Sequence, residues 1–106
     1  MTHVYNDPAD FRSEVLDGFA AAYPQYVQRV TGASGFTRAG GPLEGKVSLL
    51  IGGGSGHYPS YSGVVGTGFA DAGVLGDIFA SPSAEQVYRV ATAADGGAGV
   101  ILSFGN

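Results

Sequence analysis

Two short apolar segments, residues 46–51 (KVSLLI) and 99–104 (GVILSF), each run directly into glycine, and this pattern constrains the fold most strongly. Both are apolar at consecutive positions, which is typical of parallel strands buried between two layers of helices. A helix is indicated between them, so the two strands should be parallel neighbours joined by a right-handed crossover. The sequence therefore predicts an α/β fold with a mostly parallel sheet and crossover helices.

A first helix is predicted to begin at Asp7, which can cap its amino end, and to end at Pro24. Its apolar side chains recur every four residues, which indicates one buried face. After it, we expect residues 25–30 to form only a short turn. Residues 31–45 are rich in glycine and are expected to form a loop.

The second helix is predicted over residues 81–95, with Ser81 as its N-cap and Pro82 just inside the helix. The segment between the first strand and this helix shows no clear periodicity. We therefore expect residues 58–80 to be irregular.

Composition and charge argue against several classes of function. The chain has 106 residues, of which 44% are hydrophobic, so it can bury one modest core. Its net charge is −4 and its five lysines and arginines do not cluster, which argues against a nucleic-acid partner. Cysteine is absent, and no apolar run approaches the roughly 20 residues that span a bilayer. We expect a cytoplasmic protein without membrane contact.

Glycine is unusually abundant, at 19 of 106 residues, and four glycines lie in the five residues 52–56, directly before His57. Three glycine motifs each fail here at one position. The phosphate-binding P-loop requires a lysine where His57 stands, and the same histidine replaces the third glycine of the dinucleotide fingerprint. The hydrolase motif G-x-S-x-G around Ser55 fails at its last glycine. The segment therefore matches none of these three motifs.

A ligand site is nevertheless expected at the carboxyl ends of the two strands. Residues 52–56 should form an open loop whose backbone N–H groups face a crevice, with His57 beside them as a hydrogen-bonding partner or base. Gly105 and Asn106 follow the second strand and should reach the same pocket, which would suit a small hydroxylated molecule. The alternative is that the glycines form only a tight turn and that His57 caps a nearby carbonyl group. No carboxylate pair or histidine spacing indicates a metal site.

Residues 51–87 (IGGGSGHYPSYSGVVGTGFADAGVLGDIFASPSAEQV) resemble the substrate-binding, DhaK-type domain of the dihydroxyacetone (glycerone) kinase family. The shared features are the GGGSGH loop, Pro59, a glycine-rich segment over residues 63–76, and an F-A-S-P entry to a helix at residues 79–82. The resemblance covers nearly the whole chain but only the opening part of that domain. We therefore expect residues 1–106 to be the N-terminal portion of an incomplete substrate-binding domain.

The resemblance implies phosphorylation of a short ketose, either dihydroxyacetone or a tetrulose such as erythrulose. The donor, ATP with Mg²⁺ or a phosphoprotein, would be held on a separate kinase domain or subunit, so no cofactor is expected in this chain; a homodimer is also implied. By matching positions, the substrate would contact Gly54, Ser55, Gly56, His57 and Gly105. His57 would be the catalytic residue and take part in proton transfer. The 106 residues alone are not expected to catalyse phosphorylation of the substrate.

Three positions depart from the family pattern. Tyr58 stands where the family usually shows glutamate, Tyr61 where it shows a second histidine, and Gly105 where it shows lysine. Losing the lysine is expected to open volume, and a phenol can donate a hydrogen bond to an additional hydroxyl group. These departures favour a ketose longer than dihydroxyacetone.

Two other functions remain open at this point. A non-catalytic ketose sensor or regulatory partner would keep the glycine loop and His57 without phosphoryl transfer. A hydrolase-like enzyme could use Ser55 as its nucleophile, but it would need a triad that this chain does not supply.

Overall fold

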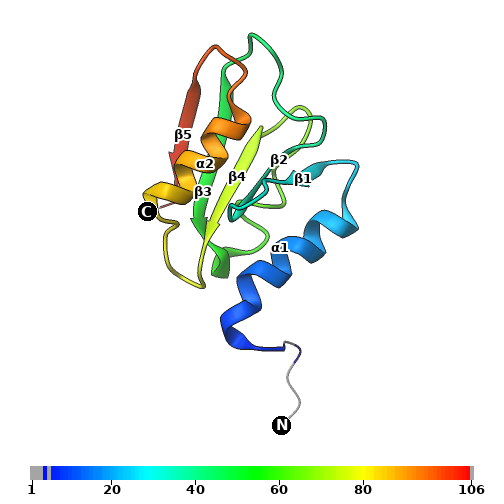
Figure 1. The fold of residues 1–106 in the computed structure, drawn as a ribbon, viewed down its shortest axis with the longest axis vertical. Coiled ribbons are helices and arrows are strands. Elements are labelled where there is room, and N and C mark those ends of the chain that lie inside the picture. Colours follow the sequence, from blue (N-terminus) through cyan, green and yellow to red (C-terminus); the bar gives the residue numbers. More distant parts are fainter. Residues whose placement is uncertain (1–3, 5, 106) are drawn as a thin grey trace.

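The computed structural model describes residue 4 and residues 6–105, which form a five-stranded sheet with helices packed against it (Figure 1). The elements in chain order are η1 (Pro8–Asp10), α1 (Phe11–Ala22), β1 (Val27–Arg29), β2 (Gly35–Arg38), β3 (Ser48–Gly54), η2 (Ser55–His57), β4 (Ala72–Gly76), α2 (Ala84–Ala94) and β5 (Val100–Phe104). The α/β class is thereby confirmed.

The sheet has the strand order β1-β2-β4-β3-β5. Strand β3 lies between β4 and β5 and is parallel to both, as expected of the two apolar segments. Strands β1 and β2 extend this parallel part as an antiparallel pair, and β2 is also antiparallel to β4. The sheet is therefore mixed, and its parallel part carries the glycine-rich ends.

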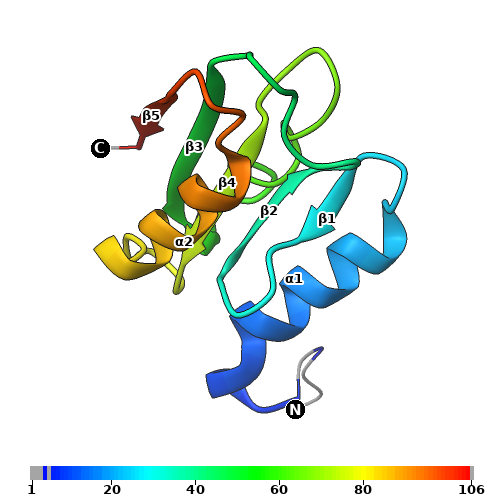
Figure 2. The ribbon, with the colours of Figure 1, turned by 45° about the horizontal axis from the view of Figure 1, so that its top comes forward.

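Each face of the sheet has its own apolar core, and the helices lie on opposite faces (Figure 2). Helix α2 packs on β2, β3 and β4, where it buries Val90 and Ala94 against Leu50 and Val74. On the other face, Leu16 of α1 joins a cluster of buried residues from strands and loop: Val27, Phe36, Val65, Ala70 and Leu75. A fully buried leucine or phenylalanine stabilises the fold by about 1.5–3 kcal/mol, so these clusters fix both helices to the sheet.

The predicted cap at Asp7 is confirmed for η1, the 3₁₀ turn that leads into α1, whereas the predicted cap of α2 is wrong by two residues. The Asp7 side chain accepts a hydrogen bond from the Ala9 N–H, and the helical segment begins as a single 3₁₀ turn. At α2 the cap is Ser83, whose hydroxyl accepts from the Gln86 N–H, and not Ser81. Pro82 therefore precedes the helix, because the chain must first pass close to Gly76: a Cβ on Gly76 would lie 2.7 Å from the Pro82 nitrogen.

The expected turn over residues 25–30 and loop over residues 31–45 are wrong, because both segments contain strands. The hairpin β1–β2 is closed by the Val30 N–H, which donates to the Gly35 carbonyl. Strand β4 lies in the segment that we expected to be irregular. These strands have only three to five residues, and their burial comes from tertiary contacts rather than from a sequence period.

Within the described part of the chain, no helix is both long enough and apolar enough to cross a lipid bilayer.

Candidate functional site

The glycine-rich segment lies at the carboxyl end of the central strand, but it is not the open loop that we expected. Gly52, Gly53 and Gly54 belong to β3, and Ser55–His57 form a single 3₁₀ turn. The strand continues through the glycines because they pair in register with β4, where Gly54 lies opposite Gly76. Of residues 52–57, only the turn Ser55–His57 therefore lies outside the hydrogen-bonded pairing of the strands.

The amide of Ser55, which was expected to face a ligand, and the amide of Gly105 are both already bonded within the protein. The Ser55 N–H donates to the Asp77 carbonyl at 3.2 Å, and the Gly105 N–H donates to the Gly52 carbonyl at 3.1 Å. Neither amide is available to a ligand in this arrangement. Any contribution of Ser55 and Gly105 to binding must come from other atoms or from their shape.

The glycines are needed because other groups approach their backbone closely. A Cβ on Gly53 would overlap the ring of Tyr61, and a Cβ on Gly54 would lie 2.9 Å from the backbone nitrogen of Ala80. A Cβ on Gly56 would lie 2.8 Å from the ring of Phe79. All three approaches are closer than ordinary van der Waals contact, so each glycine makes room for a neighbour.

His57 is exposed at the end of this turn and lies between two aromatic rings. The ring of Phe79 is edge-on to the imidazole at 5.5 Å between centroids, and the ring of Tyr61 is edge-on at 6.2 Å. No hydrogen bond joins the imidazole to another of residues 6–105, so the alternative that it caps a carbonyl group gains no support. The imidazole nitrogens are thus open to a ligand.

Tyr61 and Phe79 are unusual because both have left-handed backbones, with φ of 66° and 55°. Such φ values are strained for residues other than glycine, typically by about 1–3 kcal/mol, and they persist only where surrounding packing imposes them. Sequence reasoning singled out Tyr61 as a departure from the family pattern and residue 79 as part of the F-A-S-P entry, but it missed that the two rings flank His57. The sequence indicates these close neighbours only indirectly, through Gly53, which lies against Tyr61, and Gly56, which lies against Phe79.

Ser55 is fully buried, and its hydroxyl has no hydrogen-bond partner of good geometry among the described residues. The nearest phenol is that of Tyr58; burial raises the pKa of this phenol, and the Ser55 hydroxyl opposes that rise in part. A buried serine hydroxyl without a histidine beside it is a poor nucleophile. The hydrolase alternative is therefore not supported by the geometry.

The ends of β3 and β5 enclose a small hollow of about 260 Å³ lined by Ile51, Ser60, Tyr61, Val64, Ser103, Phe104 and Gly105. Tyr61 joins this hollow to His57, because its ring contacts the imidazole on one side and its hydroxyl lies against Gly105 on the other. Asn106, which we expected in the same pocket, lies outside the described residues. That His57 and Gly105 share one ligand stays a prediction.

The volume that we expected Gly105 to open is not open. A Cβ on Gly105 would overlap the hydroxyl oxygen of Tyr61, so the phenol already fills the space where that side chain would begin. The tyrosine at position 61 and the glycine at position 105, both departures from the family pattern, therefore fit together, because the first occupies the space left by the second.

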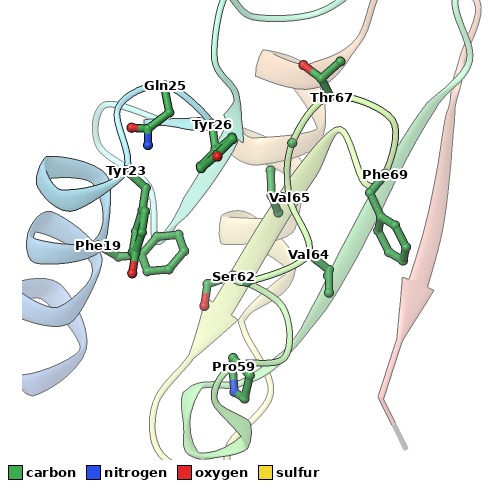
Figure 3. Close-up of a pocket in the computed structure, with 12 residues that line it drawn as sticks. Phe19, Tyr23, Gln25, Tyr26, Pro59, Ser62, Val64, Val65, Thr67 and Phe69 are labelled. Atoms are coloured by element: carbon green, nitrogen blue, oxygen red, sulfur yellow. The ribbon is translucent and has the colours of Figure 1, made fainter.

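A larger pocket of about 650 Å³ lies apart from the glycine turn, between α1 and the loop before β4 (Figure 3). Its walls are mainly apolar and are formed by Phe19, Tyr23, Gln25, Tyr26, Pro59, Ser62, Gly63, Val64, Val65, Gly66, Thr67 and Phe69. Neither His57 nor any carboxylate, ammonium or guanidinium group lines it.

The buried carboxylate near the parallel strands, that of Asp71, is held by hydrogen bonds within the protein and has a structural role. Asp71 is buried before β4, where its carboxylate accepts from the Lys46 ammonium at 2.5 Å and from the Leu49 N–H at 2.8 Å. Burial opposes ionisation, but these hydrogen bonds and the charges of Lys46 and Arg38 outweigh it and lower the pKa of Asp71. Across residue 4 and residues 6–105, no cluster of three or more histidine, aspartate or glutamate side chains could hold a metal ion.

Comparison with known proteins identifies the family of the chain. Residues 17–106 match the Dak1 domain family. An L-erythrulose kinase from Pectobacterium atrosepticum is 47% identical over 106 residues, and a D-erythrulose kinase from Mycolicibacterium smegmatis is 53% identical over 106 residues. A dihydroxyacetone-binding subunit of a PTS-dependent dihydroxyacetone kinase from Lactococcus lactis is 44% identical over 103 residues, which are 97% of this chain and 31% of the subunit.

The chain spans only 18% of the length of the two erythrulose kinases, although they match all of it. Among solved structures, the dihydroxyacetone kinase of C. freundii in complex with AMP-PNP and Mg²⁺ superposes with a TM-score of 0.85 at 33% identity, over 95% of this chain and 19% of that one. A dihydroxyacetone kinase operon co-activator superposes with a TM-score of 0.76 at 30% identity, over 84% of this chain and 27% of that one. This chain belongs to the dihydroxyacetone kinase family, and its residues 17–106 form part of the Dak1 domain of that family.

Proposed function

We propose that this chain binds a short ketose and presents it for phosphorylation, as the N-terminal portion of the substrate-binding domain of a dihydroxyacetone kinase-like phosphotransferase. The observation that carries the proposal is the placement of His57: an open imidazole between two aromatic rings, at the carboxyl end of the central parallel strand. Ligands in open α/β sheets bind at this edge.

In this proposal His57 is the catalytic residue of the chain. A ketose hydroxyl attacks the phosphorus of the donor, so an O–P bond forms while the bond from phosphorus to the donor's leaving oxygen breaks. The hydroxyl proton passes to an imidazole nitrogen, which an imidazole can accept near neutral pH. Gly54, Ser55 and Gly56 shape the turn that holds the sugar, and Gly105 closes the site from the neighbouring strand.

The phosphoryl donor is proposed to bind elsewhere, on a separate kinase domain or subunit. The solved C. freundii kinase was crystallised with AMP-PNP and Mg²⁺, and this chain matches only 19% of it, which leaves ample sequence for a nucleotide site. ATP with Mg²⁺ is therefore the proposed donor, with a phosphoprotein as the alternative. A homodimer remains part of the proposal.

We propose erythrulose rather than dihydroxyacetone as the substrate. The two erythrulose kinases are 47% and 53% identical to this chain, against 44% for the dihydroxyacetone-binding subunit. The departures at Tyr58 and Tyr61 supply phenols where the resemblance led us to expect a carboxylate and an imidazole, and a phenol suits an additional hydroxyl group.

The test is an assay of the whole protein that contains this chain, with dihydroxyacetone, L-erythrulose and D-erythrulose as substrates and with ATP or a phosphoprotein as donor. We expect an erythrulose to give the highest kcat/KM. His57→Ala should lower kcat about 100-fold or more, the usual size of a proton-transfer contribution. Its melting temperature should stay unchanged, because His57 is exposed. His3→Ala, at the other histidine of the sequence, is the matched control.

A second candidate function is a non-catalytic ketose sensor, which the match to the operon co-activator favours. The same assay separates the two functions when it is paired with calorimetric titration of each ketose. Ketose binding without phosphoryl transfer from either donor would support the sensor and contradict the kinase.

A further inference from the structure

Tyr61 lies across the ends of two neighbouring strands. Its ring covers Gly53, the sixth residue of β3, and its hydroxyl oxygen lies against Gly105, directly after β5. A Cβ on either glycine would overlap Tyr61 atoms. Two residues that are 52 positions apart in the sequence therefore lack side chains for the same reason.

A third glycine holds the backbone of the same tyrosine. Gly73 of β4 lies against the Tyr61 carbonyl oxygen, and a Cβ there would overlap that oxygen. Tyr61 itself has the left-handed φ of 66°, which costs energy in a residue other than glycine. Because glycines on or directly after three parallel strands fit one strained tyrosine, the position of its phenol is built into the fold.

The phenol of Tyr61 lies at the hollow at the strand ends, because its hydroxyl oxygen lies against Gly105 and both residues line that hollow. Tyr61 lines this hollow together with Ser60, Ser103 and Gly105, and the edge of its ring contacts His57. Within residues 6–105, no hydrogen bond engages its hydroxyl. The group can therefore donate to, or accept from, a ligand that lies beside the imidazole.

We propose that Tyr61 is the specificity-determining residue of this site. Its phenol hydrogen-bonds the hydroxyl group that erythrulose has and dihydroxyacetone lacks, and Gly105 is required because any side chain there would displace that phenol. This proposal rests on the proposed function for its substrate, whereas the fit between Tyr61 and Gly105 can be tested without one. Tyr58 is not assigned this role, because its phenol lies towards the buried Ser55 hydroxyl.

The substrate arm of the test compares Tyr61→Phe with the unchanged whole protein. Phenylalanine keeps the ring over Gly53 and removes only the hydroxyl, so folding should be preserved. We expect KM for erythrulose to rise about tenfold and KM for dihydroxyacetone to rise less than about threefold, since a site built to bind a hydroxyl discriminates through that contact. Tyr26→Phe removes a phenol oxygen from the separate apolar pocket and is the matched control.

The packing arm is a double-mutant cycle read by melting temperature. Gly105→Ala places a methyl group against the phenol oxygen and should lower the melting temperature by several degrees. In Gly105→Ala combined with Tyr61→Phe, the nearest remaining ring atom is Cζ at 3.1 Å, so most of that loss should be recovered.

The outcomes separate the two proposals. Equal changes in KM for both ketoses on Tyr61→Phe would overturn the specificity role, and absence of recovery in the double variant would overturn the fit between Tyr61 and Gly105. If the unchanged protein phosphorylates no ketose with either donor, the proposed function fails, and the Tyr61 specificity role fails with it. The melting-temperature cycle would then still decide whether Tyr61 and Gly105 are matched.

Discussion

At the scale of single residues, the glycines around His57 differ in what lies against them, and this difference predicts different consequences of adding a methyl group. Backbone stands next to Gly54, where an added Cβ would lie 2.9 Å from the Ala80 nitrogen. The exposed ring of Phe79 stands next to Gly56, at 2.8 Å from an added Cβ. A ring at the surface can move aside, whereas backbone in a packed turn cannot do so without strain.

We therefore expect Gly54→Ala to destabilise the protein by about 1–3 kcal/mol, the usual cost of overpacking. Gly56→Ala should leave the free energy of unfolding nearly unchanged but lower kcat/KM, because the displaced Phe79 ring is the neighbour of the His57 imidazole. Denaturant titration and initial rates of the whole protein measure the two effects. Gly18→Ala in α1, whose added methyl meets nothing within 4 Å outside its own helix and chain neighbours, is the control and should not destabilise the protein. Equal destabilisation by both variants at the turn would contradict the argument.

The sequence predicts approximately where the site lies, but it does not predict which side chain fills the space beside Gly105. His57 and Gly105 were expected at one edge because both follow apolar strands, and the strands are indeed parallel neighbours. That Tyr61 fills the space at Gly105 depends on the register of β3 with β5 and on a left-handed backbone at residue 61. Neither property is written in the local sequence, because both arise from packing between segments.

At the scale of secondary structure elements, the starts of β3 and β4 are joined by one buried carboxylate. Asp71 accepts from Lys46 and from the Leu49 N–H, and its own N–H donates to the Leu49 carbonyl at 2.9 Å. Removing its charge should destabilise the protein by about 1.5–3 kcal/mol, the range for hydrogen bonds to a charged group.

The pH dependence follows from the lowered pKa of Asp71. The group binds its proton more weakly in the folded state, so its contribution is complete above about pH 5 and is lost as the pH falls below about 4. We expect Asp71→Asn to be destabilised at about pH 7 and the difference from the unchanged protein to shrink towards about pH 3, as measured by denaturant titration. Asp77→Asn breaks the more exposed pair with Arg12 and should change stability by less than about 1 kcal/mol at either pH. A pH-independent difference for Asp71→Asn would contradict the assignment.

The elements that sequence reasoning found and missed differ in length and in where their burial comes from. Strands β3 and β5 and both helices were found, because each carries an apolar run or period of its own. Strand β4 has glycine at Gly73 and Gly76, which are poor strand formers. Its five residues are all buried because α2 covers one face and Tyr61 with Val65 covers the other.

At the scale of the whole molecule, one edge of the sheet is formed by β5, which pairs only with β3 among the strands that the structure describes. Parallel strands are normally covered on both faces, yet here Ile101, Leu102 and Phe104 are 57%, 48% and 50% exposed. An edge strand of this kind exposes both unpaired backbone hydrogen-bonding groups and an apolar surface, and each favours association with another chain.

We therefore expect the 106-residue chain, when expressed by itself, to associate through β5 at micromolar concentration. Ile101→Lys should shift it towards the monomer, because a lysine at an edge strand opposes pairing with a second strand and costs little where the side chain is already exposed. Leu43→Lys changes a similarly exposed side chain, 47% exposed, in the loop between β2 and β3 and outside β5, and should leave association unchanged. Sedimentation velocity measures the distribution of species. If both variants were as associated as the unchanged chain, β5 would not be the contact, and the apolar pocket between α1 and the loop before β4 would be the next surface to test.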